Sequence, residues 1–105
     1  AGNPSRKIQS VALCGGSGSD LVEEAFRQGA DVYLSSEVKH STARWVEDTG
    51  FCVIDASHYA TEKPAMALLA GLLETLAHDR NWKLQIYQST SEKPAFSFIN
   101  KNDFL

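Results

Sequence analysis

The chain has 105 residues, of which 43% are hydrophobic and 22% are charged, with a formal net charge of −3 at pH 7. This composition predicts one small globular domain and excludes a disordered chain. The mildly acidic balance does not favour a nucleic acid partner, and no apolar run approaches the roughly 18 residues of a membrane span. Because the polar start has no signal-peptide core, we expect a cytoplasmic protein in which Cys14 and Cys52 are reduced, buried thiols.

The first half of the chain alternates apolar runs with turn formers. Residues 1–6 are turn-forming and aperiodic, so they are interpreted as a linker or a vector remnant before a single domain at residues 7–105. Strands are predicted at 7–14, 31–35 and 51–55. Helices are predicted from Ser19 or Asp20 to about residue 28, and at 40–48, with Gly29 and Gly50 as their C-terminal stops.

The second half of the chain is dominated by one long apolar pattern. A helix is predicted from Thr61, its N-cap, to about residue 80. Its buried face is predicted to contain two alanines and four leucines, namely Ala67, Leu68, Ala70, Leu72, Leu73 and Leu76. The alternation at 83–88 predicts a half-exposed edge strand, residues 94–99 are a candidate for a further short strand, and we expect a loose tail from Asn100.

The resulting order is β-α-β-α-β-α-β, which predicts a three-layer α/β/α fold with a mostly parallel sheet. In such sheets, ligands gather at the carboxyl ends of the strands. Three of the most polar segments of this chain follow predicted strands, namely 15–19, 35–40 and 55–58. The pattern therefore predicts a functional site at this edge of the sheet.

His58 and Glu62 are the first candidates for chemistry, since both are good ligands for zinc, manganese or iron. Proline fits the first turn of a helix but not its interior, so Pro64 is expected in the first turn after Thr61. His58 would then lie in the preceding turn and would meet Glu62 through a loop. The spacing alone also fits a packed histidine and a glutamate favoured by the helix dipole.

The glycine-rich loop has two interpretations. Gly15, Gly16, Ser17, Gly18 and Ser19 precede a helix, where backbone N–H groups attract anions such as a substrate phosphate. The loop lacks the Lys-Ser/Thr ending of a P-loop, and it equally fits a tight turn that needs small residues.

Four further polar residues follow the second and third strands. Glu37, Lys39 and His40 could supply an acid, a base or phosphate contacts to a substrate, or could form a solvated loop. Asp55 could orient an imidazole next to a metal, or could cap a turn.

Four strings of this sequence resemble the C-terminal half of the Nif-three-like family, whose members are often called GTP cyclohydrolase type-2-like. They are VALCGGSGS at 11–19, GADVYL at 29–34, EVKH at 37–40 and DASHYATE at 55–62. The resemblance covers residues 7–99 and keeps the order and spacing of the strings. It implies an α/β fold whose two similar halves enclose a dinuclear metal site.

The resemblance also implies roles for particular residues. His58 and Glu62 correspond to metal ligands of the family, with zinc, iron or manganese as occupants. The glycine-rich loop and the segment 37–40 correspond to residues that line the same cavity. The remaining ligands are expected from an N-terminal half that this chain does not contain, and family members form toroidal hexamers. We therefore expect a partial site, completed by the missing half, and a homo-oligomer or other self-association.

Three functions follow as hypotheses. The first is a metal-dependent hydrolase that acts on a nucleotide or a similar small molecule. The alternative is a metal-containing scaffold or protein-interaction module without catalysis. A metal-free nucleotide-binding domain that uses the glycine-rich loop and Lys39 is the third.

Overall fold

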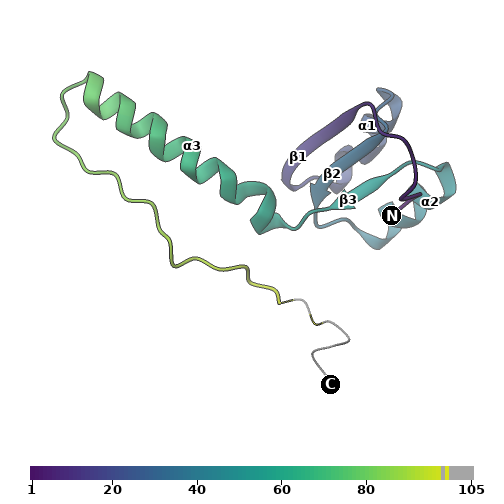
Figure 1. Ribbon diagram of the computed structural model, residues 1–105. Helices are drawn as coiled ribbons and strands as arrows, with labels where there is room; N and C mark the ends of the chain where they lie inside the picture. Colours follow the sequence, from purple (N-terminus) through teal and green to yellow (C-terminus); the bar gives the residue numbers. More distant parts are fainter. Residues whose placement is uncertain (98, 100–105) are drawn as a thin grey trace. The chain divides into compact units, whose positions relative to one another are not determined.

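The computed structural model describes residues 1–97 and 99, and the chain divides into two compact units, Ala1–Pro64 and Ala65–Leu105. The strands are β1 (Val11–Ser17), β2 (Val32–Ser36) and β3 (Val53–Asp55) (Figure 1). The helices are the 3₁₀ turn η1 (Ser19–Leu21), α1 (Val22–Arg27), α2 (His40–Thr49) and α3 (His58–Asp79). Helix α3 begins in the first unit and continues into the second.

The sheet of the first unit is parallel and has the order β1-β2-β3. Helical connections join the strands, so the α/β class and the parallel sheet are confirmed. The register of β1 is irregular, because Leu13 pairs with Leu34 while Ser17 pairs with Ser36. The four-residue step in β1 matches a two-residue step in β2, so β1 bulges at its carboxyl end.

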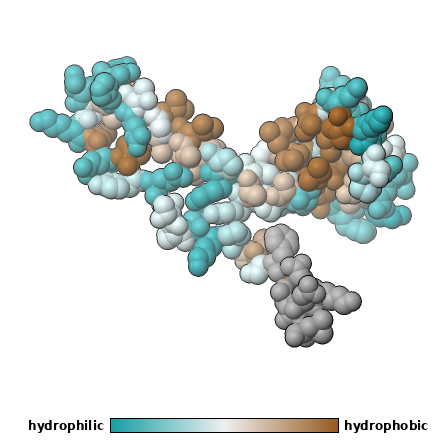
Figure 2. Space-filling model, viewed as in Figure 1, coloured by the Kyte–Doolittle hydropathy of each residue, from teal (hydrophilic) through white to brown (hydrophobic). Residues whose placement is uncertain are grey.

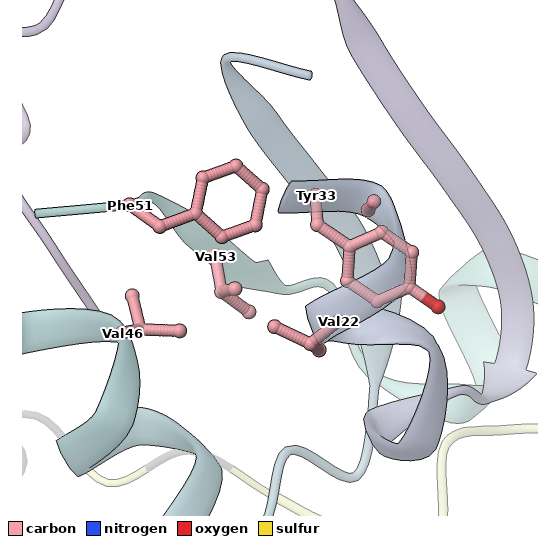
Figure 3. Packing of buried hydrophobic residues seen from close by; sticks show 6 residues of the cluster. Val22, Tyr33, Val46, Phe51 and Val53 are labelled. Atoms are coloured by element: carbon pink, nitrogen blue, oxygen red, sulfur yellow. The ribbon is translucent and has the colours of Figure 1, made fainter. Parts of the chain in front are cut away.

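Helices α1 and α2 cover one face of this sheet. Tyr33 and Val53 are register partners on that face, and they pack against Val22 of α1 and Val46 of α2 (Figure 3). Phe51 completes the cluster with no exposed surface. The alternation of strand side chains turns these apolar residues to the same side, so burying them fixes both helices on the sheet.

The opposite face of the sheet exposes apolar side chains. Val11 is 60% exposed, Leu13 71% and Ile54 49%. Figure 2 shows hydrophobic residues gathered on the first unit. We call Val11, Leu13 and Ile54 the open face.

Residues 1–6, which the sequence predicts as a linker or vector remnant, make specific contacts with the sheet. The amino group of Ala1 donates to the carbonyl of Val53 at 2.9 Å, and the amide of Val53 donates to the carbonyl of Ala1 at 3.1 Å. Arg6 donates to the carbonyl of Gly50 at 2.8 Å. The first residues therefore lie along the edge strand β3.

The start of α3 differs from the prediction. The helix begins at His58, three residues before Thr61, and the N-cap is Ser57, whose hydroxyl accepts from the amide of Ala60 at 3.3 Å. Pro64 consequently lies inside the helix rather than in its first turn. It is tolerated because the bond that it removes belongs to the carbonyl of Ala60, near the start of the helix.

The second unit also departs from the prediction. Residues 83–88 form no strand, because a strand requires a hydrogen-bonded neighbour and the sheet of the first unit contains only β1, β2 and β3 in the described residues. The candidate strand at 94–99 is not formed at 94–97 and 99, and residue 98 and the tail from Asn100 lie outside the described residues. The predicted buried face of the long helix is largely exposed, with Leu68 at 71% and Leu72 at 69%. Across the described residues, none of the helices combines the length and apolar character needed to cross a membrane.

Candidate metal site

His58 and Glu62 lie one turn apart on the same face of α3. Nε2 of His58 is 3.1 Å from Oε1 of Glu62, and about half of each side chain is exposed. The prediction that they meet through a loop is wrong, because the helix already begins at His58. The i, i+4 spacing on a regular helix instead brings an imidazole nitrogen and a carboxylate oxygen together.

The other nitrogen of the imidazole contacts a second carboxylate. Nδ1 of His58 is 2.8 Å from Oε1 of Glu37, in the turn that follows β2. The hydrogen bond that Nδ1 donates to the Glu37 carboxylate raises the pKa of His58, desolvation opposes this shift, and the nearby charges of Glu62 and Glu37 raise the pKa further. A neutral imidazole can donate to only one of the two carboxylates. The geometry therefore favours either an imidazolium, which donates to both carboxylates, or a neutral ring with a cation in place of the proton on one nitrogen.

Of the two roles predicted for Asp55, the structure shows the turn cap, and it is Glu37 that contacts the imidazole. The carboxylate of Asp55 accepts from the amides of Val38 and Ser57, both at 3.0 Å, and so caps the turn. The contact with the imidazole comes from Glu37. A carboxylate in this position does not suit the anion-binding role considered for Glu37.

Gly16 lies in the bulge of β1 and touches the histidine–glutamate pair. Its amide donates to Oγ1 of Thr61 at 3.0 Å, and its carbonyl accepts from the hydroxyls of the fully buried Ser35 and Ser36, at 3.1 and 2.5 Å. Its φ is +67°, and an added Cβ would overlap Oε1 of Glu62 and lie 3.4 Å from Nε2 of His58. Any other residue here would have a strained backbone and would require the Glu62 carboxylate to move.

The rest of the glycine-rich loop is also used for close packing. Gly15, Gly16 and Ser17 belong to β1 rather than to a loop. At Gly18 an added Cβ would overlap the hydroxyls of Ser35 and Tyr33, and the carbonyl of Gly18 accepts from Tyr33 at 2.9 Å. These contacts favour the tight-turn interpretation over the anion cradle, since the following α1 has only six residues.

Lys39, His40 and Ser19 surround the turn without reaching the pair. Lys39 forms an exposed ion pair with Asp20, with Nζ 2.7 Å from Oδ1. His40 is the exposed first residue of α2. Ser19 is buried, and its hydroxyl donates to the carbonyl of Glu37 at 3.0 Å. Ser19 therefore supports the backbone of the site, and nothing in the sequence pattern marks it for this role.

The donor set fits a divalent metal in part. Zinc lies about 2.0–2.2 Å from imidazole nitrogen and carboxylate oxygen, and two such ligands must be less than about 4 Å apart, as Nε2 and Oε1 are. Over residues 1–97 and 99, however, no three His, Cys, Asp or Glu side chains converge on one point. His58 and Glu62 thus form a two-ligand arrangement, whereas a catalytic zinc has three protein ligands.

Comparison with known proteins gives one family and several solved structures. The family described as Duf34/NIF3 (NGG1p interacting factor 3) matches residues 1–94. The "GTP cyclohydrolase 1 type 2 homolog" of Streptococcus pneumoniae serotype 4 is 32% identical over 94 residues, which are 90% of this chain and 35% of that protein. The protein of the same name from Streptomyces coelicolor is 33% identical over 92 residues, 85% of this chain and 32% of its own length.

Among solved structures, the crystal structure of Staphylococcus aureus protein SA1388 matches with a TM-score of 0.85 and 31% identity, over 93% of this chain and 32% of that one. A Bacillus cereus protein related to NIF3 matches with a TM-score of 0.87 over 93% of this chain and 27% of its own, and at 24% identity it supports the fold alone. The chain spans about a third of the length of the curated relatives it matches.

Proposed function

This chain belongs to the Duf34/NIF3 family, and from that premise we propose that His58 and Glu62 are two ligands of a dinuclear metal site. The observation that carries the proposal is the 3.1 Å separation of Nε2 and Oε1 on an accessible helix face at the carboxyl end of the sheet. Zinc, iron and manganese all suit a nitrogen and oxygen donor pair. The other ligands would come from outside this chain.

The proposed reaction is a metal-dependent hydrolysis. A bound divalent ion lowers the pKa of a coordinated water to about 7 and so supplies hydroxide near neutral pH. In this chain, His58 would bind through Nε2, Glu62 would bind through its carboxylate, and Gly16 would leave room for both. Because the curated relatives are called GTP cyclohydrolase 1 type 2 homologs, we propose a nucleotide or a similar small molecule as substrate.

A second candidate is a metal-containing interaction module without catalysis. The family description refers to an interacting factor, and the open face exposes apolar side chains that a partner or a second copy could cover. The two candidates predict different results for the variant His58→Ala. Loss of metal in His58→Ala would abolish function in a hydrolase, whereas an interaction module would still bind its partner.

We also propose that the protein works in a reducing compartment such as the cytoplasm. Cys14 and Cys52 are both free thiols, and Cys52 is buried. Free thiols persist where glutathione and thioredoxin keep cysteines reduced.

Metal content of the purified chain tests the proposed site. The chain is loaded with zinc or manganese, desalted and measured by mass spectrometry, together with His58→Ala and Glu62→Ala. His78→Ala is the matched control, since His78 also lies beside a carboxylate, with Nδ1 3.3 Å from Oδ1 of Asp79. We expect metal in the parent and in His78→Ala, and loss in both site variants. Equal metal content in all four proteins would refute the site.

Hydrolysis is tested separately by incubating the metal-loaded complete protein, which would supply the remaining ligands, with a panel of nucleotides. Product that requires both metal and His58 supports the hydrolase. Metal binding without turnover on any nucleotide favours the interaction module instead.

A further inference from the structure

We propose that Glu37 is a positioning residue that holds the imidazole of His58 with Nε2 directed at Glu62. This role rests on the proposed metal site, because orienting Nε2 matters only if His58 binds a metal. Its geometry stands independently on contacts of the first unit.

The first step is the hydrogen bond between Glu37 and His58. Oε1 of Glu37 lies 2.8 Å from Nδ1, on the side of the ring opposite to Glu62. In a neutral ring with the proton on Nδ1, Nε2 carries the free electron pair. A carboxylate on Nδ1 therefore selects the tautomer in which Nε2 can bind a metal. Carboxylate–histidine–metal arrangements of this kind orient the ring and raise its basicity.

The second step is the backbone of Glu37, which is held in an unfavourable conformation. Its φ is +55°, a left-handed value that is uncommon for a residue other than glycine. The hydroxyl of Ser19 donates to the carbonyl of Glu37 at 3.0 Å and accepts from the amide of Lys39 at 2.9 Å. Ser19 thereby clamps both sides of the turn that carries the carboxylate.

The third step is Asp55, which ties the two partners to each other. Its Oδ2 accepts from the amide of Val38, the neighbour of Glu37, and its Oδ1 accepts from the amide of Ser57, the neighbour of His58. One carboxylate thus fixes the distance between the segments that carry the imidazole and its partner. The backbone is further joined by the amide of Ala56, which donates to the carbonyl of Ser35 at 2.8 Å.

These supports distinguish the contact from an ordinary surface ion pair. An exposed pair holds two flexible side chains weakly and contributes little. Here the backbone on both sides is fixed by hydrogen bonds that do not involve the ion pair, and Ser19 is 7% exposed. A left-handed residue that its surroundings over-determine is typical of a functional site.

The first experiment tests the tautomer in the metal-free chain. Long-range ¹⁵N NMR identifies which ring nitrogen of His58 carries the proton at a pH where the ring is neutral. Glu62→Ala provides the background, because it removes the competing carboxylate from Nε2. We expect the Nδ1–H tautomer in Glu62→Ala, and a shift to Nε2–H in Glu37→Ala/Glu62→Ala. An unchanged tautomer overturns the proposal, and this arm does not depend on metal binding.

The second experiment measures zinc affinity of the chain by titration, with Glu62 intact. We expect Glu37→Ala to weaken zinc binding by about 10–100-fold. Glu37→Gln should retain most of the affinity, since its amide oxygen still accepts from Nδ1. Asp20→Asn controls for the loss of one negative charge, because Asp20 pairs with Lys39 instead.

The outcomes separate the two proposals. Equal weakening in Glu37→Ala and Asp20→Asn overturns the positioning role, as does a loss in Glu37→Gln as large as that in Glu37→Ala. No zinc binding in the parent shows that His58 and Glu62 do not hold the ion without the remaining ligands, while the tautomer still decides whether Glu37 orients the ring. If Glu37→Ala does not fold, Glu37→Gln in the Glu62→Ala background is used, and it must keep the Nδ1–H tautomer.

Discussion

Replacing Gly16 by alanine should separate the strain of a left-handed backbone from the crowding of the metal site. At φ +67° the new Cβ would meet Oε1 of Glu62 at less than the 3.0 Å that real Cβ atoms keep. Gly29 is the matched control, since its φ is +80° and an added Cβ meets nothing within 4 Å. Both variants carry the same kind of backbone strain, and only Gly16→Ala adds an overlap.

The expected magnitudes follow from these contacts. A left-handed residue other than glycine costs about 1–2 kcal/mol, which should be the whole effect of Gly29→Ala. If the overlap shifts the bulge, the Gly16 carbonyl also loses its hydrogen bonds with Ser35 and Ser36. At about 0.5–1.5 kcal/mol each, this adds about 1–3 kcal/mol. If Glu62 moves instead, stability changes less, but zinc affinity should fall at least about tenfold.

Urea unfolding gives the free energy of unfolding of each variant, and zinc titration gives its affinity. Gly15→Ala is a second control within the same motif, because its Cβ would lie 3.7 Å from the carbonyl of Thr61, an ordinary contact. The reasoning is refuted if Gly16→Ala and Gly29→Ala lose the same stability and bind zinc equally well.

Three further predictions use other parts of the first unit. The hydrogen bond that His58 donates to Glu37 raises the pKa of His58 above its ordinary value of 6.5, so its contribution to stability is complete below pH 6.5 and is lost as pH rises through the folded pKa. Urea unfolding of the metal-free chain should show this fall, and His58→Ala should abolish it. Amides of Gln9 and Ser10 lower the pKa of Asp31 from 3.8 to about 2, so its contribution is present above pH 3.8 and is lost as pH falls through about 2. An acid titration of Asp31→Asn that matches the parent would refute this. Leu13→Lys on the open face should reduce self-association, measured as sedimentation mass at high concentration, and a parent that is already monomeric would refute the self-association.

The sequence predicted the sheet well because its signal is local. Val32 to Ser36 is an apolar run that ends in small polar residues, and Gly29 and Gly50 stop the helices on either side of it. Such patterns depend only on neighbouring residues, and β2 and β3 lie within one or two residues of their predicted bounds. Strand β1 is shifted from the predicted 7–14 to Val11–Ser17, because the bulge extends it into the glycine-rich segment. The strand predicted at 83–88 would have needed a hydrogen-bonded neighbouring strand, and a local sequence pattern does not show whether one is present.

The sequence names the candidate site residues but does not give the contacts between them. Pro64 suggested a later helix start, because a local rule excludes proline from helix interiors, whereas the actual cap is Ser57. Asp55 and Glu37 are both carboxylates after strands, and their sequence positions do not reveal which one reaches the imidazole. Ser35 and Ser36 resemble any polar strand end, although both bind the carbonyl of Gly16.

The left-handed residues of this chain explain why these contacts escape a local analysis. Three of them, Gly29, Gly50 and Asn81, follow the carboxyl ends of helices, where such a conformation is expected. Gly2 lies near the amino terminus, and the remaining three, Gly16, Glu37 and Ser57, occur at or just after β1, β2 and β3 respectively. Each turns the chain as it leaves the sheet. Together they place the glycine backbone of Gly16, the carboxylate of Glu37 and the helix N-cap Ser57 around His58. Two of these residues are not glycine, so their conformations are maintained against an intrinsic cost by Ser19 and Asp55. Strain at the ends of β2 and β3, beside an unstrained glycine at the end of β1, is therefore gathered around one imidazole, and such clustering is typical of a functional site.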